Sequence, residues 1–313
     1  MPERDEVFPL RRTLVETAIG NSVNAFQFGV KRLQSEFTTP TLVGAEAYVS
    51  GPLGELEFDI HSILCRLFEE AGTPTGNDVE FSLSALERER YRSRSSRQRA
   101  RIAAALGNLV RGVITVRDVD PRTGEHCPGQ LWELNLLEGA GATTDYEAMR
   151  AAIRRGEMPA LRTCGSLKGT ATYRAILPSW LANALRRGDA RALNEDVQFE
   201  LNGAAKSAWV VLETQAFIQD GAEEECTVID LTAETLDALG LHHARLADRR
   251  KHLPDVLARI RASDPTYLAT DIAPHPSGRR GASQLHVLRA TGERRQQLLR
   301  DHTRRRLTSA VSA

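Results

Sequence analysis

Cysteine is scarce in this sequence of 313 residues. The four cysteines, Cys65, Cys127, Cys164 and Cys226, are far apart, and none has a second cysteine or a histidine at zinc-ligand spacing. We therefore expect no disulfide framework and no metal. No apolar run approaches the ~18 residues of a membrane span. The start, MPERDEVFPLRR, has acidic residues where a secretory signal needs positive charge. These absences predict a cytoplasmic protein without a membrane partner.

Signatures of catalysis are absent as well. The sequence has no G-x-x-x-x-G-K-[ST] loop for nucleotide phosphates, no H-E-x-x-H motif and no clustered carboxylates. DNA nicking of the rolling-circle type needs a His-x-His pair beside a nucleophilic tyrosine, and no His-x-His occurs. His242 and His243 lie at the start of a basic helix, where a turn or a phosphate contact explains them better than metal ligation. We expect no enzymatic activity, no catalytic residue and no cofactor.

Lysine is rare and net charge is absent, but positive charge is concentrated in two segments. Residues 87–117 contain nine arginines and two acidic residues, a net charge of +7. Residues 245–306 contain fifteen basic and six acidic residues, a net charge of +9, and the rest of the chain sums to −16. A GC-rich coding sequence would explain arginine in place of lysine but not this clustering. The segregation indicates two surfaces that face nucleic acid.

Each basic segment overlaps a copy of the same order of predicted elements: a short helix, an arginine-rich helix, an apolar strand, a glycine-containing turn and a second strand. The copies are Asn77–Gly139 and Cys226–Ala290. This order is typical of a winged helix-turn-helix, and the chain is long enough for two domains. We predict an α+β fold with two tandem winged helix-turn-helix modules and short antiparallel sheets. The predicted domains are an N-terminal arm with strand elements (1–58), module 1 (59–139), module 2 with leading strands and helices (140–291), and a basic C-terminal helix or tail (292–313).

Capping residues and apolar periodicity locate the elements of module 1. Asp59 is a good N-cap for the first helix, and Ser93 or Ser95 for the arginine-rich helix. The buried stripe of the arginine-rich helix is expected to be Ile102, Leu106 and Leu109. The runs GVITVRD and LWELNLL flank the turn-forming DPRTGEHCPG and predict a wing.

Module 2 shows corresponding signals. DVQFEL reads as a strand, and Asn202 and Thr232 are predicted to cap the two helices that precede the basic helix. Pro254 leaves two alternatives: the basic helix begins near His252, or it bends at the proline. Strands are predicted on either side of the second wing, PHPSGRRGAS, at 267–272 and 284–289.

Arginine pairs bidentately with guanine in the major groove, and arginines at the margins neutralise phosphates. Residues near the N-terminus of a recognition helix are placed to read bases. The candidates in module 1 are Arg92, Arg94, Ser95, Arg97, Gln98, Arg99 and Arg101. The candidates in module 2 are Arg245, Arg249, Arg250 and Lys251. The wing residues placed to reach a flanking minor groove or the backbone are Arg122, Arg279 and Arg280.

The alternative interpretation is a solvated helix face that neutralises itself with acids one turn away. Glu87 and Glu89 are spaced to pair with arginines in this way. After Arg90, however, no acidic residue occurs until Asp118. Self-neutralisation therefore fails for the arginine-rich helix, whereas contact with bases and contact with phosphate alone both stay open.

The arrangement resembles the bacterial plasmid replication initiators that have two tandem winged-helix domains. The resemblance covers residues 53–290 and rests on the order of elements. It also rests on FDIHSILCRLFEEAGTP, which precedes a basic helix, and on YRAILPSWLANALRRG, which leads to DVQFELNGAAKSAWVVLETQAF. It implies sequence-specific binding of double-stranded DNA at origin repeats, opening of the adjacent duplex, recruitment of the host helicase machinery, and homodimers that repress their own gene.

Three functions follow as hypotheses. The first is a non-catalytic initiator of plasmid, or extrachromosomal replicon, replication. The second is a winged-helix transcriptional regulator or partition protein, although such regulators usually combine one module with a sensor or dimerisation domain. The third is a scaffold whose winged folds bind proteins. The basic segment 292–306 either extends the DNA footprint or is a solvated terminus.

Overall fold

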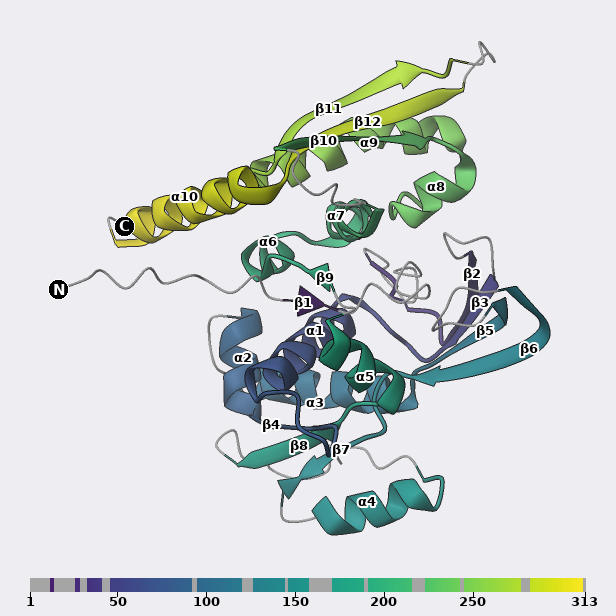
Figure 1. Cartoon of the computed structure of the whole chain (residues 1–313), viewed down its shortest axis with the longest axis vertical. Coiled ribbons are helices and arrows are strands. Elements are labelled where there is room, and N and C mark those ends of the chain that lie inside the picture. Colours follow the sequence, from purple (N-terminus) through teal and green to yellow (C-terminus); the bar gives the residue numbers. More distant parts are fainter. Residues whose placement is uncertain are drawn as a thin grey trace. The chain divides into compact units, whose positions relative to one another are not determined.

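A computed structural model describes residues 12–13, 26–28, 33–40, 46–91, 95–119, 126–143, 146–157, 171–188, 191–215, 223–242, 245–276 and 282–311. The chain forms two compact units that divide between Leu193 and Asn194 (Figure 1). We call Arg11–Leu193 the N-terminal unit and the part from Asn194 onward the C-terminal unit. The sequence placed the division after residue 139 instead.

The N-terminal unit contains helices and short strands in the following order: β1 (Arg12–Thr13), β2 (Glu36–Pro40), β3 (Glu46–Ser50), α1 (Glu55–Glu70), β4 (Asp78–Ser82), α2 (Leu83–Tyr91), α3 (Ser96–Arg111), β5 (Val113–Val119), β6 (His126–Asn135), β7 (Gly139–Ala142), α4 (Tyr146–Arg154), β8 (Thr172–Ile176), α5 (Ser179–Arg187) and β9 (Arg191–Ala192). The C-terminal unit contains α6 (Glu195–Glu200), α7 (Gly203–Gln215), β10 (Glu224–Asp230), α8 (Ala233–Ala238), α9 (Leu246–Ser263), β11 (Tyr267–Pro274), β12 (Ser283–Ala290) and α10 (Gly292–Val311).

Helices α1, α2 and α3 pack together and form the core of the N-terminal unit. The predicted stripe of α3 is confirmed, because Ile102, Leu106 and Leu109 are fully buried. Ser95 is the N-cap of α3, and its Oγ accepts a hydrogen bond from the Gln98 N–H at 3.2 Å. The helix-turn-helix predicted for module 1 is therefore α2 followed by α3.

The strands of the N-terminal unit form separate antiparallel sheets. The predicted hairpin is confirmed as β5 and β6, which join β2 and β3 in a sheet of order β2-β3-β5-β6. Strand β4, between α1 and α2, does not join this hairpin but pairs with β8 in a sheet of order β4-β8-β7. Residues after 139 therefore complete the first unit, which is why the division of the chain lies later than predicted.

The predicted N-cap at Asp59 is wrong. Helix α1 begins at Glu55, and the Glu57 carboxylate accepts a hydrogen bond from the N–H of the N-cap residue Gly54 at 2.9 Å. Asp59 lies inside the helix, fully buried, with its Oδ2 2.5 Å from Arg90 Nε of α2. Asp59 therefore forms an ion pair between α1 and α2 and does not cap a helix.

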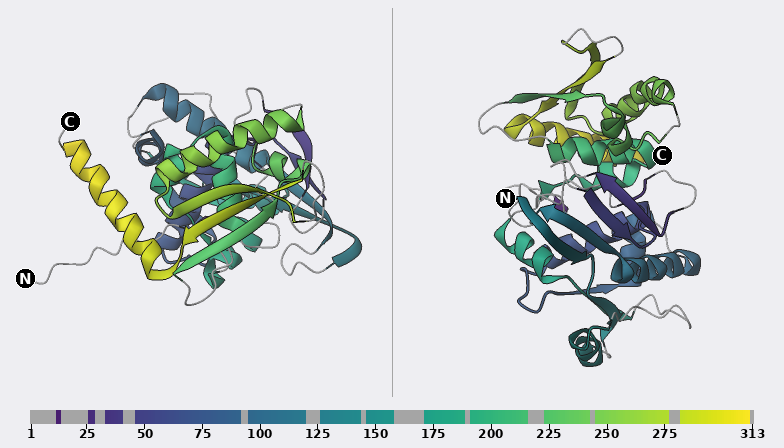
Figure 2. Two further views of the ribbon diagram at one scale, coloured as in Figure 1. Left: turned by 90° about the horizontal axis from the view of Figure 1, so that it is seen from above. Right: turned by 90° about the vertical axis from the view of Figure 1, so that its right-hand side faces the viewer.

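The C-terminal unit has the simpler winged-helix topology. Its sheet has the order β10-β12-β11, with Ile229, Leu285 and Ile272 in register across the three strands. Helix α9 packs against α7 and β11, and Figures 1 and 2 show it along one face of the sheet. Thr232 caps α8 as predicted, since its Oγ1 accepts from the Thr235 N–H at 3.1 Å.

Three other predictions for this unit have definite outcomes. The strand expected at DVQFEL is wrong, because Glu195–Glu200 forms α6 under an Asn194 cap that accepts from the Asp196 and Val197 N–H groups. Helix α9 begins before His252 and continues through Pro254. The proline has no N–H to donate to the Arg250 carbonyl, but both sides keep helical geometry. The basic tail is helical, as α10.

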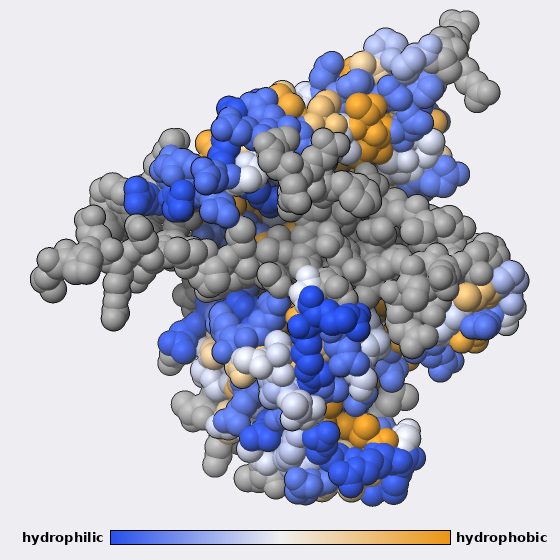
Figure 3. Space-filling model, viewed as in Figure 1, coloured by the Kyte–Doolittle hydropathy of each residue, from blue (hydrophilic) through white to orange (hydrophobic). Residues whose placement is uncertain are grey.

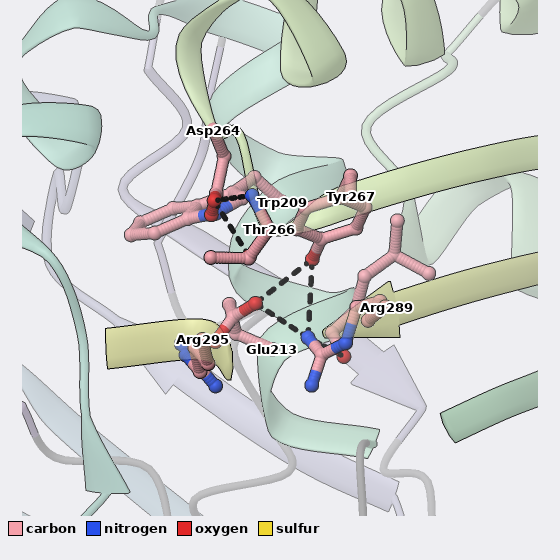
Figure 4. A network of polar contacts seen from close by, with 8 residues as sticks. Trp209, Glu213, Asp264, Thr266, Tyr267, Arg289 and Arg295 are labelled. Carbon is pink, nitrogen blue, oxygen red and sulfur yellow. Dashed lines mark hydrogen bonds and ion pairs between the residues drawn. The ribbon is translucent and has the colours of Figure 1, made fainter. Parts of the chain in front are cut away.

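A buried polar network joins α7, β11, β12 and α10 (Figure 4). The Glu213 carboxylate accepts hydrogen bonds from Tyr267 Oη at 3.0 Å, from Arg295 Nη2 at 2.7 Å and from Arg289. Beside it, the Asp264 carboxylate accepts from Trp209 Nε1 at 2.8 Å. Glu213 is fully buried and Arg289 nearly so. The network fixes the start of α10 to the core of the unit.

Candidate nucleic-acid interface

One face of α3 is exposed and basic. Arg97, Ala100, Arg101, Ala104 and Arg111 are exposed along it, at spacings of three and four residues or their multiples. The opposite face is buried against α1 and α2. The two alanines leave the backbone accessible between the arginines, and the helix contains no acidic residue. Helix α3 is therefore an amphipathic helix whose exposed basic face has the form that fits a major groove.

The turn between α2 and α3 is fixed by the buried Glu87 of α2. Its carboxylate accepts a hydrogen bond from the Ser95 N–H, and Glu87 Oε2 lies 3.9 Å from Arg99 Nη1. Ser95 Oγ also donates to Gln98 Oε1 at 3.0 Å. Among the predicted DNA contacts, Ser95, Gln98 and Arg99 thus hold the helix start in place, and Arg97 and Arg101 extend from it.

Arg101 rests on an aromatic ring. Its guanidinium lies 5.7 Å from the centroid of the Tyr91 ring, and Arg90 lies 5.3 Å from the same centroid. Arg90 is in turn held by the buried Asp59. Burial raises the pKa of Tyr91. The stack therefore restricts where the Arg101 head group can lie on the exposed face of α3.

Helix α9 divides its basic residues between two roles. Arg245 and Lys251 are exposed. Arg249 Nη1 lies 2.8 Å from Asp237 Oδ2 and donates to the Ala233 carbonyl at 3.3 Å. Arg250 Nη2 donates to the Leu231 carbonyl at 3.2 Å. The guanidinium groups of Arg249 and Arg250, both predicted to contact DNA, thus tie α9 to α8 and to the end of β10.

The remaining predicted contacts are outside the described residues: Arg92, Arg94, Arg122, Arg279 and Arg280. The strands that lead to the two wing tips, β5 with β6 and β11 with β12, are described and antiparallel. Sequence reasoning missed Tyr91 and Glu87. The signal for Glu87 was an acidic residue one turn before an arginine-rich stretch, which was interpreted only as surface neutralisation.

Other kinds of site receive no support from the described part of the chain. Its residues contain no group of three or more His, Cys, Asp or Glu side chains that could hold a metal ion. None of the helices within it is both long and apolar enough to cross a bilayer. The face in Figure 3 is largely hydrophilic where it is described, with small apolar patches.

The fold and this interface define a protein of two tandem winged helix-turn-helix units with short antiparallel sheets. No protein-family model matches the chain, and no curated protein sequence matches it either.

Solved structures do resemble it. A crystal structure of domains 2 and 3 of RctB is 10% identical, with a TM-score of 0.57 over 90% of this chain and 100% of that chain. Another structure of RctB domains 2-3 is also 10% identical, with a TM-score of 0.50 over 89% and 99%. The Pi initiator protein in complex with iteron DNA is 9% identical over 76% and 95%, and its TM-score of 0.46 is too low to argue from. The predicted resemblance to two-module initiators is thus confirmed at the level of the fold.

Proposed function

We propose that this chain is a non-catalytic, sequence-specific DNA-binding initiator of plasmid, or extrachromosomal replicon, replication. The observation that carries the proposal is the acid-free exposed face of α3, with Arg97 and Arg101 on a helix held in place by a helix-turn-helix. A second winged-helix unit in the same chain favours an extended DNA site over a single contact. The fold shared with RctB domains 2 and 3 is compatible with this function.

The DNA-binding part of the proposal is tested by a salt titration. Fluorescence anisotropy would measure binding of the full chain to a duplex taken from the region flanking its gene. Replacing Arg97 and Arg101 together with alanine removes two phosphate or base contacts, so the slope of log K against log salt should fall by up to ~1.8. The matched control is Arg154→Ala with Arg155→Ala, two exposed arginines of which the first ends α4 and the second follows it. Equal slopes for the two double variants would contradict the proposal.

The initiator part of the proposal needs a replication assay. A plasmid whose only origin is the flanking DNA should be maintained in cells that make the wild-type chain and lost with the Arg97→Ala, Arg101→Ala variant. Footprints over repeated sites and capture of the host helicase machinery are the further expectations, together with a homodimer that represses its own gene. If the chain binds the repeats and controls transcription without supporting maintenance, it is a winged-helix regulator or partition protein instead.

A further inference from the structure

The exposed faces of the two basic helices differ in charge. Helix α3 presents arginines alone, whereas the exposed face of α9 carries the carboxylates of Asp248 and Asp255 beside Arg245 and Lys251. The exposed residues of α9 thus include two carboxylates among the cations Lys251, Arg259 and Arg261, and the exposed Arg245 precedes the helix. Arg249 and Arg250 add positive charge to α9, but their head groups are held by α8 and by Leu231 at the end of β10.

The two carboxylates of α9 are not neutralised by the arginines nearest to them in sequence. Arg259, one turn after Asp255, donates through Nη2 to Asn202 Oδ1 at 2.9 Å. Arg249, next to Asp248, lies against Asp237. Within the described residues neither Asp248 nor Asp255 has an ion-pair partner at 4 Å or less. Both side chains therefore offer open acceptor oxygens to whatever approaches this face of α9.

A carboxylate on a DNA-facing helix acts in two opposite ways. Near phosphates it is repelled, so it weakens binding to DNA of any sequence. At the floor of the major groove it accepts a hydrogen bond from the N4 amino group of cytosine, which the other three bases do not present in the same position. Asp248 lies in the first turn of α9, where recognition helices contact base edges.

We propose that α9 is the discriminating helix of the protein: Asp248 and Asp255 weaken its binding to general DNA and read cytosine at the specific site, while α3 supplies most of the phosphate-dependent affinity. This inference rests on the proposed DNA-binding function and assigns sequence discrimination to α9 and most of the affinity to α3. Discrimination then comes from rejecting wrong sequences as well as from contacting the right one.

A purely structural role for Asp248 is the alternative, because an acidic residue in the first helical turn interacts favourably with the helix dipole. That role affects the stability of α9 but not which bases are preferred. Base preference is therefore the quantity to measure, with thermal unfolding as a check that the variants are folded.

The experiment is selection from a random-sequence duplex library, with the full chain as wild type and as Asp248→Asn with Asp255→Asn. Asparagine keeps the volume and removes the charge. Glu147→Gln, which removes an exposed carboxylate from α4, is the control. Binding of each protein to an unselected duplex is measured by anisotropy in parallel.

We expect the α9 variant to bind the unselected duplex about tenfold more tightly, because two carboxylates that phosphates repel are removed. It should also lose its cytosine preference in one part of the selected motif, since one base contact accounts for roughly tenfold discrimination. The control should match wild type in both assays. If the α9 variant selects the wild-type motif with unchanged cytosine positions, this inference is overturned while the proposed function stands. If the wild-type chain enriches no sequence, the proposed function fails and the inference fails with it.

Discussion

The buried Glu213 gives the sharpest stability prediction. Its carboxylate is fully buried and serves two arginines, Arg289 of β12 and Arg295 of α10, as well as Tyr267 Oη. The Glu213→Gln substitution removes the negative charge and leaves two nearly buried guanidinium groups without a counter-ion. Removing one partner of a buried ion pair typically costs ~3–5 kcal/mol. We expect a loss of that size in the unfolding free energy of the C-terminal unit.

Tryptophan fluorescence during urea unfolding would measure this loss. Trp209 donates a hydrogen bond to Asp264 beside the network, while Trp132 and Trp180 lie in the N-terminal unit. A background with these two changed to phenylalanine makes Trp209 the reporter of the C-terminal unit.

Glu224 provides the control, because its pair with Arg294 is well exposed on both sides. Exposed pairs contribute ~0–1 kcal/mol, so Glu224→Gln should shift the midpoint little. If Glu213→Gln changes the unfolding free energy by no more than Glu224→Gln does, the network does not hold α10 to the core of the C-terminal unit.

Three smaller predictions concern the N-terminal unit. If the Tyr91 ring positions Arg101, a double-mutant cycle of Tyr91→Leu and Arg101→Ala in DNA binding should show coupling of ~0.5–1 kcal/mol, and additive effects would exclude the stack. Burial lowers the pKa of His61 to about 4, so stability should fall by ~3 kcal/mol as pH drops from ~6.5 toward 4, and His61→Gln should abolish this dependence in acid unfolding curves. Ser95→Ala should cost ~1 kcal/mol in thermal unfolding, whereas Ser96→Ala should cost much less.

Structural features that depend on residues close together in the sequence could be predicted from it. The buried stripe of α3 and the Ser95 and Thr232 caps depend on residues within one or two helical turns, and all are confirmed. DVQFEL was misread because its apolar residues fit a strand or a helix equally well in so short a run, and the Asn194 cap decides for the helix.

Contacts between segments that are far apart in the sequence could not be predicted from it. Asp59 looked like a cap because its partner Arg90 comes from another helix. Because β4 pairs with β8, the division of the chain lies later than residue 139, where the sequence placed it. At the candidate site, the sequence located both basic helices but gave no sign that Arg249 and Arg250 are engaged with α8 and β10.

The central claim, that the exposed face of α3 lies on DNA, is tested most directly by site-specific crosslinking. A photo-crosslinking amino acid would replace Ala100, on that face, or Ala148, an exposed alanine of α4. With a duplex that the wild-type chain selects, we expect a protein–DNA adduct from position 100 and little from position 148. Equal yields, or an adduct from position 148 alone, would contradict the account.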